Sequence, residues 1–234
     1  ALHMERAIVG AVAIVRLAHP LPTLLNAAVA AALAIVAGAR LEQAGLAAAT
    51  MLGIHSCIGS LNDVFDQARD AGRREKPLAL GTVSKRAALV LAVVGLGGGL
   101  VAASLLGPSA LVLAVVGAAC GIAYDAGVKD TPLSWLPFAL GVGVVPLFAW
   151  AAVGLDAPPP ILGLSVAAIP GGAAVALQNG LADRVLDERA GLHSAVVRIG
   201  ERRAQSLALL AHGAAIGAVL VVSPPGASFG ALLV

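Results

Sequence analysis

The chain has 234 residues, of which 59% are hydrophobic and 12% are charged, and its mean hydropathy is +0.93. Soluble domains carry roughly 25% charged residues, so this composition excludes an ordinary soluble protein and predicts an integral membrane protein. The formal net charge is only +2, and the sequence has no basic patch with interleaved aromatic residues. We therefore expect the lipid bilayer to be its partner, and neither nucleic acid nor another protein.

Seven apolar segments are long enough to cross about 30 Å of hydrocarbon as helices. Ala and Leu dominate them, and none shows the alternating pattern of barrel strands. In chain order they cover residues 21–38, 45–62, 86–106, 109–124, 132–153, 160–182 and 204–222, and an eighth segment begins at Ser228. We predict an all-α, polytopic membrane bundle of seven to nine transmembrane helices, formed by a single domain over residues 1–234.

The Lys and Arg residues predict how this bundle is oriented. Of the 15 basic residues, only Arg40 falls on one side of the predicted bundle, and the others flank the opposite ends of the spans. Because cytoplasmic connections are enriched in Lys and Arg, we expect the N-terminus and the connections after the second, fourth and sixth spans to be cytoplasmic. The membrane would be the cell membrane if the cell is prokaryotic.

Two of these cytoplasmic connections carry the same polar pattern, N-x3-D-x3-D. The residues are Asn62, Asp66 and Asp70 in the first copy and Asn179, Asp183 and Asp187 in the second. Each copy starts at the end of a span and is followed by a basic stretch, a glycine (Gly81 or Gly200) and a new span. Four spans separate the copies, so we predict two parallel repeat halves, roughly residues 16–124 and 132–234, around a central chamber.

A spacing of four residues would place the polar side chains of each copy on one face of a helix, about 5 to 6 Å apart. Like charges at that separation repel, and one charge at the centre of a membrane costs roughly 2.5 to 3.5 kcal/mol. We therefore expect cations between the two copies. Oxygen ligands without nearby Cys favour Mg²⁺, which completes its coordination shell with water and substrate phosphates. A solvated, salt-bridged surface is the alternative, which the matched repetition disfavours.

The first copy, NDVFDQARD at residues 62–70, resembles the NDxxDxxxD signature of the UbiA superfamily of intramembrane prenyltransferases. DRVLD at residues 183–187 is similar to the second signature of that family, DxxxD, and the resemblance covers roughly residues 16–205. It implies that Mg²⁺ held by both motifs binds an isoprenyl diphosphate, which ionises, and that a lipophilic or aromatic acceptor captures the allylic cation. Members typically have nine helices, whereas this chain supplies seven and part of an eighth.

The resemblance also assigns roles to single residues. The implied metal ligands are Asn62, Asp66, Asp70, Asp183 and Asp187, and we expect Asn62 and its counterpart Asn179 to contact substrate. A third signature looks present as Tyr124 and Lys129, although their spacing exceeds the usual YxxxK by one residue. Lys129 would bind the diphosphate and stabilise its developing charge, so the expected catalytic residues are Tyr124, Lys129, Asp66 and Asp183. Positive-inside anchoring is the alternative for Lys129.

Four further polar residues have open roles. Asn26, in the middle of the first span, is expected to make an interhelical contact or to contact the acceptor. His55 lies seven residues before Asn62 on the same helical face, where it is either a packing residue or a substrate ligand. We expect Arg73, a turn beyond the first motif, to contact phosphate, and Asp63 to orient a basic partner.

Two other functions compete with prenyl transfer. A UbiA-type terpene cyclase would use the same motifs without an acceptor, but cyclases guide cations with aromatic rings, and this chain has only four Phe, two Trp and one Tyr. A small membrane transporter or channel would place charges along its path, whereas the acids here cluster at one face and none falls in the central part of a span. The sequence favours a prenyltransferase and leaves the acceptor open.

Overall fold

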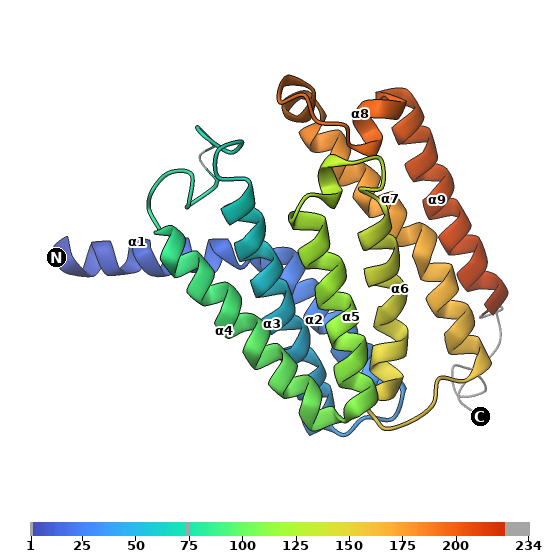
Figure 1. Ribbon diagram of the computed structural model, residues 1–234. Helices are drawn as coiled ribbons and strands as arrows, with labels where there is room; N and C mark the ends of the chain where they lie inside the picture. Colours follow the sequence, from blue (N-terminus) through green and yellow to red (C-terminus); the bar gives the residue numbers. More distant parts are fainter. Residues whose placement is uncertain (1, 74, 223–234) are drawn as a thin grey trace.

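The computed structural model describes residues 2–73 and 75–222, and within them the only regular elements are helices (Figure 1). They are α1 (Leu2–Leu17), α2 (Pro20–Val36), α3 (Leu41–Phe65), α4 (Lys85–Leu106), α5 (Pro108–Asp125), the 3₁₀ turn η1 (Val128–Asp130), α6 (Leu136–Ala151), α7 (Pro159–Arg189), α8 (Ala195–Ile199) and α9 (Glu201–Val222). The predicted all-α class is confirmed. The eighth segment predicted from Ser228 lies outside the described residues.

Each of the seven predicted spans coincides with one helix, namely α2 to α7 and α9. Within the described residues, five helices are long and apolar enough to cross a membrane: α3, α4, α5, α7 and α9. The end of α1 and α2 form a pair bent by 55° that would provide a sixth span, and α6 is shorter, with 16 residues. The polytopic bundle is confirmed, while the exact number of spans and the two repeat halves remain predictions.

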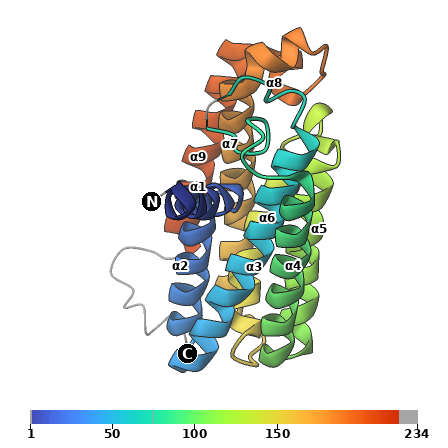
Figure 2. The same ribbon diagram turned by 90° about the vertical axis from the view of Figure 1, so that its left-hand side faces the viewer.

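Helix α1 was not expected from the hydropathy pattern. It lies across the direction of the bundle in both views (Figures 1 and 2). The chain turns into α2 at His19, which has φ 47° and is the only described residue other than glycine with positive φ. Pro20 explains why α1 ends before it, because proline has no N–H for the helix and disfavours helical geometry in the residue that precedes it.

Small residues line the contacts between helices. Ala30 and Ala47 are fully buried, and Gly53 of α3 faces Gly95 and Gly99 of α4. The large apolar side chains that are most exposed include Val93, Leu105, Val166, Leu209 and Leu210. This is the distribution expected in lipid, where helices associate through close backbone approach while the lipid solvates the bulky side chains.

We predict that Gly53→Ala destabilises the bundle. A Cβ at this position would lie 2.4 Å from the Gly95 carbonyl oxygen and 2.7 Å from the Gly99 Cα, so α3 and α4 would have to separate. Overpacking of this kind costs about 1 to 3 kcal/mol. A lower melting temperature in detergent is the expected result. Gly97→Ala is the matched control, because Gly97 belongs to the same helix pair and has nothing within 4 Å of its Cβ position. An unchanged melting temperature for Gly53→Ala would contradict this account of the packing.

Two long helices bring the two polar motifs to the same end of the bundle. With 31 residues, α7 is about 46 Å long, which exceeds the roughly 30 Å of hydrocarbon. Helix α3, with 25 residues, is also longer than the hydrocarbon requires. Their surplus turns extend toward the end of the bundle that carries the α3–α4 connection and α8, at the top of Figure 1. We call this the motif end.

Candidate active site

The two motifs differ in their secondary structure. Asn62 lies in the last turn of α3, and the chain continues through two further turns in which the Asp66 amide donates to the Asn62 carbonyl and the Asp70 amide donates to the Asp66 carbonyl. All three residues of the second motif lie within α7. The expected arrangement on one helical face therefore holds for the second motif only, because α3 ends at Phe65 and Asp70 belongs to the connection that follows.

Two arginines join the motifs to each other. Arg69 lies 2.5 Å from Asp66 and 3.3 Å from Asp187. Arg73 lies 3.3 Å from both Asp70 and Asp183. Each guanidinium therefore bridges one carboxylate of the first motif and one of the second, although more than a hundred residues separate the motifs in the chain.

Two lysines also contact polar side chains of the first motif. The Lys129 ammonium lies 2.7 Å from Asp66 and is only 7% exposed. Lys76 donates to Asp63 at 2.7 Å and to the Asn62 side-chain oxygen at 3.2 Å. Basic side chains of the chain itself therefore screen the motif carboxylates from one another in this arrangement, and the expected Mg²⁺ remains a prediction.

The basic side chains of the α3–α4 connection are held in their charged forms. Burial alone would lower the pKa of Arg69, but its hydrogen bond to Asp66 and the charges of Asp66, Asp130 and Asp187 together raise it above its ordinary value. Burial opposes the charge of Lys76 in the same way, and contacts with Asp63 and Asp70 raise the pKa of that ammonium. A ligand that takes the carboxylates must therefore move these cations, because deprotonation does not remove them.

Asp63 has the partner that the sequence suggested and one that it did not. Its side chain is 1% exposed and accepts a hydrogen bond from Lys76, which confirms the expected basic partner. The imidazole of His19, at the bend between α1 and α2, lies 3.0 Å from the same carboxylate oxygen. The bend packs closely on α3 beside Gly59, one turn before the motif. No pattern in the sequence indicated this contact of His19 with Asp63, because it depends on the unexpected bend.

Three further residues expected at the site lie outside the ion-pair network. The Asn179 side chain is exposed, and among the described residues it makes no hydrogen bond, unlike its counterpart Asn62. Asn26 donates to the Pro22 carbonyl of its own helix at 2.8 Å, so this local bond replaces the expected interhelical one. His55 is half-buried and makes no hydrogen bond to any described residue. Their roles as substrate contacts remain predictions.

Tyr124 lies at the edge of the network. Its ring packs edge-on against Phe138 of α6, with 4.9 Å between the ring centroids. Its neighbour Asp125 accepts a hydrogen bond from Asn62, so the end of α5 that carries Tyr124 lies beside the first motif.

Three acid or hydroxyl residues of the site were missed by the sequence analysis. Asp125 accepts a hydrogen bond from the Asn62 amide at 3.0 Å, Asp130 lies 3.2 Å from Arg69, and the Ser194 hydroxyl donates to Asp187 at 3.3 Å. Asp125 follows Tyr124 and Asp130 follows Lys129, so their neighbours in the chain were the only available signal. Single acids in connections are otherwise typical of a solvated surface.

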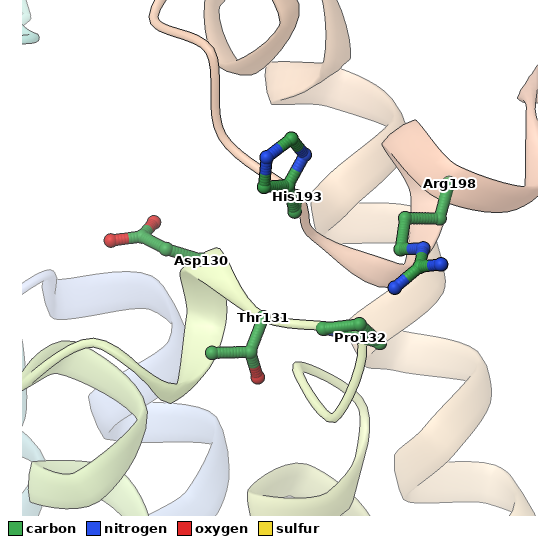
Figure 3. A pocket seen from close by; sticks show the side chains of 5 residues that line it. All are labelled: Asp130, Thr131, Pro132, His193 and Arg198. Carbon is green, nitrogen blue, oxygen red and sulfur yellow. The ribbon is translucent and has the colours of Figure 1, made fainter.

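A pocket of about 530 Å³ lies beside this network, between the α5–α6 and α7–α8 connections (Figure 3). It is lined by Asp130, Thr131, Pro132, His193 and Arg198. The Asp130 carboxylate points away from Arg198 in this view and belongs to the network through its contact with Arg69. The pocket therefore adjoins the motifs without containing them, because basic side chains occupy the space between the acids.

The oxygen ligands of the site suit a hard divalent cation. Asp63, Asp70 and Asp125 each have one buried carboxylate oxygen with no hydrogen-bond partner. The described residues contain no group of three His, Cys, Asp or Glu side chains placed to hold a metal by themselves. Mg²⁺ does not need such a group, since it typically takes one or two carboxylates and fills its shell with water and phosphate. The donor chemistry fits Mg²⁺, and Asp66, Asp70, Asp183 and Asp187 are the residues that would hold it.

Comparison with known proteins identifies the family of this chain. The model of the UbiA prenyltransferase family matches residues 21–234. The apo structure of a UbiA homolog from Aeropyrum pernix K1 is similar, with 25% identity, a TM-score of 0.73, and coverage of 85% of this chain and 77% of that chain. No curated protein matches the chain.

Two more distant structures share the fold. A UbiA homolog from Archaeoglobus fulgidus bound to GPP and Mg²⁺ has 19% identity and a TM-score of 0.71, with coverage of 90% of this chain and 77% of that one. A digeranylgeranylglyceryl phosphate synthase has 17% identity and a TM-score of 0.73, with coverage of 92% and 76%. The match of the family model over most of the chain shows that this integral, multi-pass membrane protein belongs to the UbiA prenyltransferase family.

Proposed function

We propose that this protein is a Mg²⁺-dependent prenyltransferase that transfers an isoprenyl group from a prenyl diphosphate to an acceptor within the membrane. The observation that carries the proposal is the joining of the two motifs by arginine, with Arg69 between Asp66 and Asp187 and Arg73 between Asp70 and Asp183. A site with carboxylates on both sides and guanidinium groups between them matches the two components of a magnesium diphosphate. The Archaeoglobus fulgidus homolog binds such a pair, GPP with Mg²⁺.

In this proposal the acidic side chains of the site bind the metal, and the basic side chains bind the diphosphate. The carboxylates of both motifs would hold Mg²⁺, and the metal would supply positive charge to the departing diphosphate. Arg73 and Lys76 turn from the motif carboxylates toward the phosphate oxygens, and Lys129, released by Asp66, binds them from its place beside Asp125. The allylic C–O bond then breaks with both electrons leaving on the diphosphate, and the acceptor attacks the allylic cation and releases a proton. The apolar helices below exclude the water that would otherwise capture the cation.

The acceptor and the sidedness are further parts of the proposal. We place the motif end on the cytoplasmic side, because that end carries nearly all of the Lys and Arg residues. A lipophilic or aromatic acceptor would reach the site from the membrane. In a prokaryotic cell the protein would lie in the cell membrane.

The test is product formation by the purified protein with Mg²⁺ and prenyl diphosphates of increasing length, each with and without a panel of acceptors. The proposal expects release of diphosphate and formation of a prenylated acceptor, both lost with chelator. A hydrocarbon or terpene alcohol formed equally well without an acceptor would instead show a cyclase. Absence of both kinds of product with every prenyl diphosphate would contradict the proposal.

We predict that Lys129→Ala lowers kcat more than it raises KM for the prenyl diphosphate. The buried ammonium would act on negative charge that grows as the diphosphate leaves, so its removal should cost about 10² to 10³ in kcat. Steady-state kinetics would measure the division between the two constants. Lys85→Ala is the matched control, because Lys85 is an exposed base at the same end of the bundle. A larger change in KM than in kcat would assign Lys129 to substrate binding.

A further inference from the structure

Asp125, the last residue of α5, belongs to neither motif and yet lies inside the ion-pair network. It is 2% exposed, so its carboxylate has been removed from water almost completely. One of its oxygens, Oδ2, has no hydrogen-bond partner among the described residues. A buried carboxylate with an unsatisfied oxygen is costly to fold, which makes Asp125 a poor choice unless the charge serves the site.

The other oxygen connects Asp125 to the two side chains on which the proposed reaction depends. Asp125 Oδ1 accepts a hydrogen bond from Asn62 Nδ2 at 3.0 Å and lies 3.8 Å from Lys129 Nζ. Asn62 Nδ2 also donates to Asp66 at 3.2 Å, and Lys129 Nζ lies 2.7 Å from the same Asp66 oxygen. The four side chains therefore form a closed ring in which Asp125 and Asp66 stand on opposite sides of one amide and one ammonium.

The backbone between Asp125 and Lys129 is shaped to make this contact. Helix α5 ends at Asp125, Gly127 adopts φ 130°, and Val128–Asp130 form a single 3₁₀ turn. Glycine adopts such a positive φ without steric cost, and the resulting reversal carries Lys129 back over the carboxylate at the end of α5. The extra residue between Tyr124 and Lys129, relative to the usual spacing of the third signature, is accommodated in this turn.

Asp66 and Asp125 differ in what else they must do. Asp66 is shared by Asn62, Arg69 and Lys129, and it is one of the acids that would hold Mg²⁺. Asn62 and Lys129 are the hydrogen-bond and ion-pair partners of the Asp125 side chain among the described residues. When Asp66 turns toward a metal, Asp125 is the carboxylate that remains beside the ammonium.

We propose that Asp125 is a positioning residue that holds the Lys129 ammonium and the Asn62 amide in place while the motif acids bind the magnesium diphosphate. This inference rests on the proposed prenyltransferase function. Asp125 acts through Lys129 and does not itself touch the substrate.

The test is a double-mutant cycle of Asp125→Asn and Lys129→Met. Asp125→Asn keeps the shape of the side chain and an oxygen for the Asn62 amide, but removes the charge that holds Lys129. We expect it to lower kcat by about 10- to 100-fold with less than about a threefold change in KM for the prenyl diphosphate. In the Lys129→Met background the same substitution should change kcat by less than about twofold, because the group through which it acts is gone. Asp156→Asn, at an exposed acid, is the control.

A second readout does not require turnover. Melting temperatures of the four substrate-free proteins should show the same coupling, with the double variant less destabilised than the sum of the single variants. Equal effects of Asp125→Asn on kcat in both backgrounds, or additive melting temperatures, would overturn the inference. If Asp125→Asn does not fold, Asp125→Ser replaces it in the same cycle. A wild-type protein without turnover would contradict the proposed function instead, while the thermal cycle would still decide whether Asp125 holds Lys129.

Discussion

Alanine in place of Asp183 is expected to abolish turnover and to leave the bundle folded. Asp183 is 48% exposed on its side-chain surface and within the described residues has a single ion pair, with Arg73, so its removal leaves little buried charge without a partner. The substitution would, however, remove one of the two carboxylates that the second motif contributes to the proposed metal site. We expect product formation to fall by at least about 10³-fold, at the upper end of what single electrostatic groups contribute to catalysis, because binding and ionisation both need the metal.

Asp66→Ala should be as inactive as Asp183→Ala but less stable. Asp66 is 12% exposed and lies against Arg69 and Lys129, so its loss leaves two cations without their nearest counter-charge. Asp156→Ala is the control for both variants, because Asp156 is an exposed acid in the α6–α7 connection at the other end of the bundle. Turnover near the wild-type level in either motif variant, measured on folded protein by product chromatography, would contradict the assignment of the site.

The sequence was sufficient for the helices that cross the bundle but not for α1. The length and hydropathy of an apolar segment can be read directly from the sequence. For this reason the seven predicted spans correspond to seven helices. Charged residues such as Arg6 and Arg16 interrupt the apolar sequence of α1. The segment therefore resembles the polar region beside a membrane span and not a span itself. The bend at His19 adds a left-handed backbone conformation that no residue type there indicates.

The site was predictable where residue spacing repeats and unpredictable where it depends on distant contacts. The repeated motif located Asp66, Asp70, Asp183 and Asp187 at one end of the bundle. The bridging position of Arg69 depends on Asp187, which is 118 residues away, and Asp125 depends on Asn62, which is 63 residues away. No local pattern reports such pairs.

The contrast between Asn62 and Asn179 shows a further limit of the sequence pattern. The motif matches in both copies, but Asn62 is bound by Asp66, Asp125 and Lys76, whereas the Asn179 side chain is exposed. The basic residues that surround the first copy lie within it (Arg69), follow it in the chain (Arg73 and Lys76) or come from the α5–α6 connection (Lys129). Equal spacing therefore did not give the two asparagines equal surroundings.

Mg²⁺ and a prenyl diphosphate are expected to stabilise the protein together by more than the sum of their separate effects. Mg²⁺ alone must displace Arg69 and Arg73 from the motif carboxylates, and each displaced guanidinium stays charged because arginine is not deprotonated in proteins. The diphosphate alone meets the negative charge of the motif acids. Bound together, the metal takes the carboxylates and the phosphate oxygens receive the arginines, which bind phosphate well through paired N–H groups.

The expected result is a melting temperature in detergent that rises steeply only when a non-hydrolysable prenyl thiodiphosphate and Mg²⁺ are both present. A ligand at a hundred times its Kd adds about 2.7 kcal/mol to the free energy of unfolding. For a chain of this length that corresponds to a rise of about 5 to 11 °C. Asp70→Asn combined with Asp187→Asn should remove the excess over additivity, because each acid belongs to one arginine bridge, with Arg73 and Arg69 respectively. Asp156→Asn should retain it, and chelator should abolish it in every variant. Simple additivity in the wild-type protein would mean that the two motifs do not share one metal-bound diphosphate.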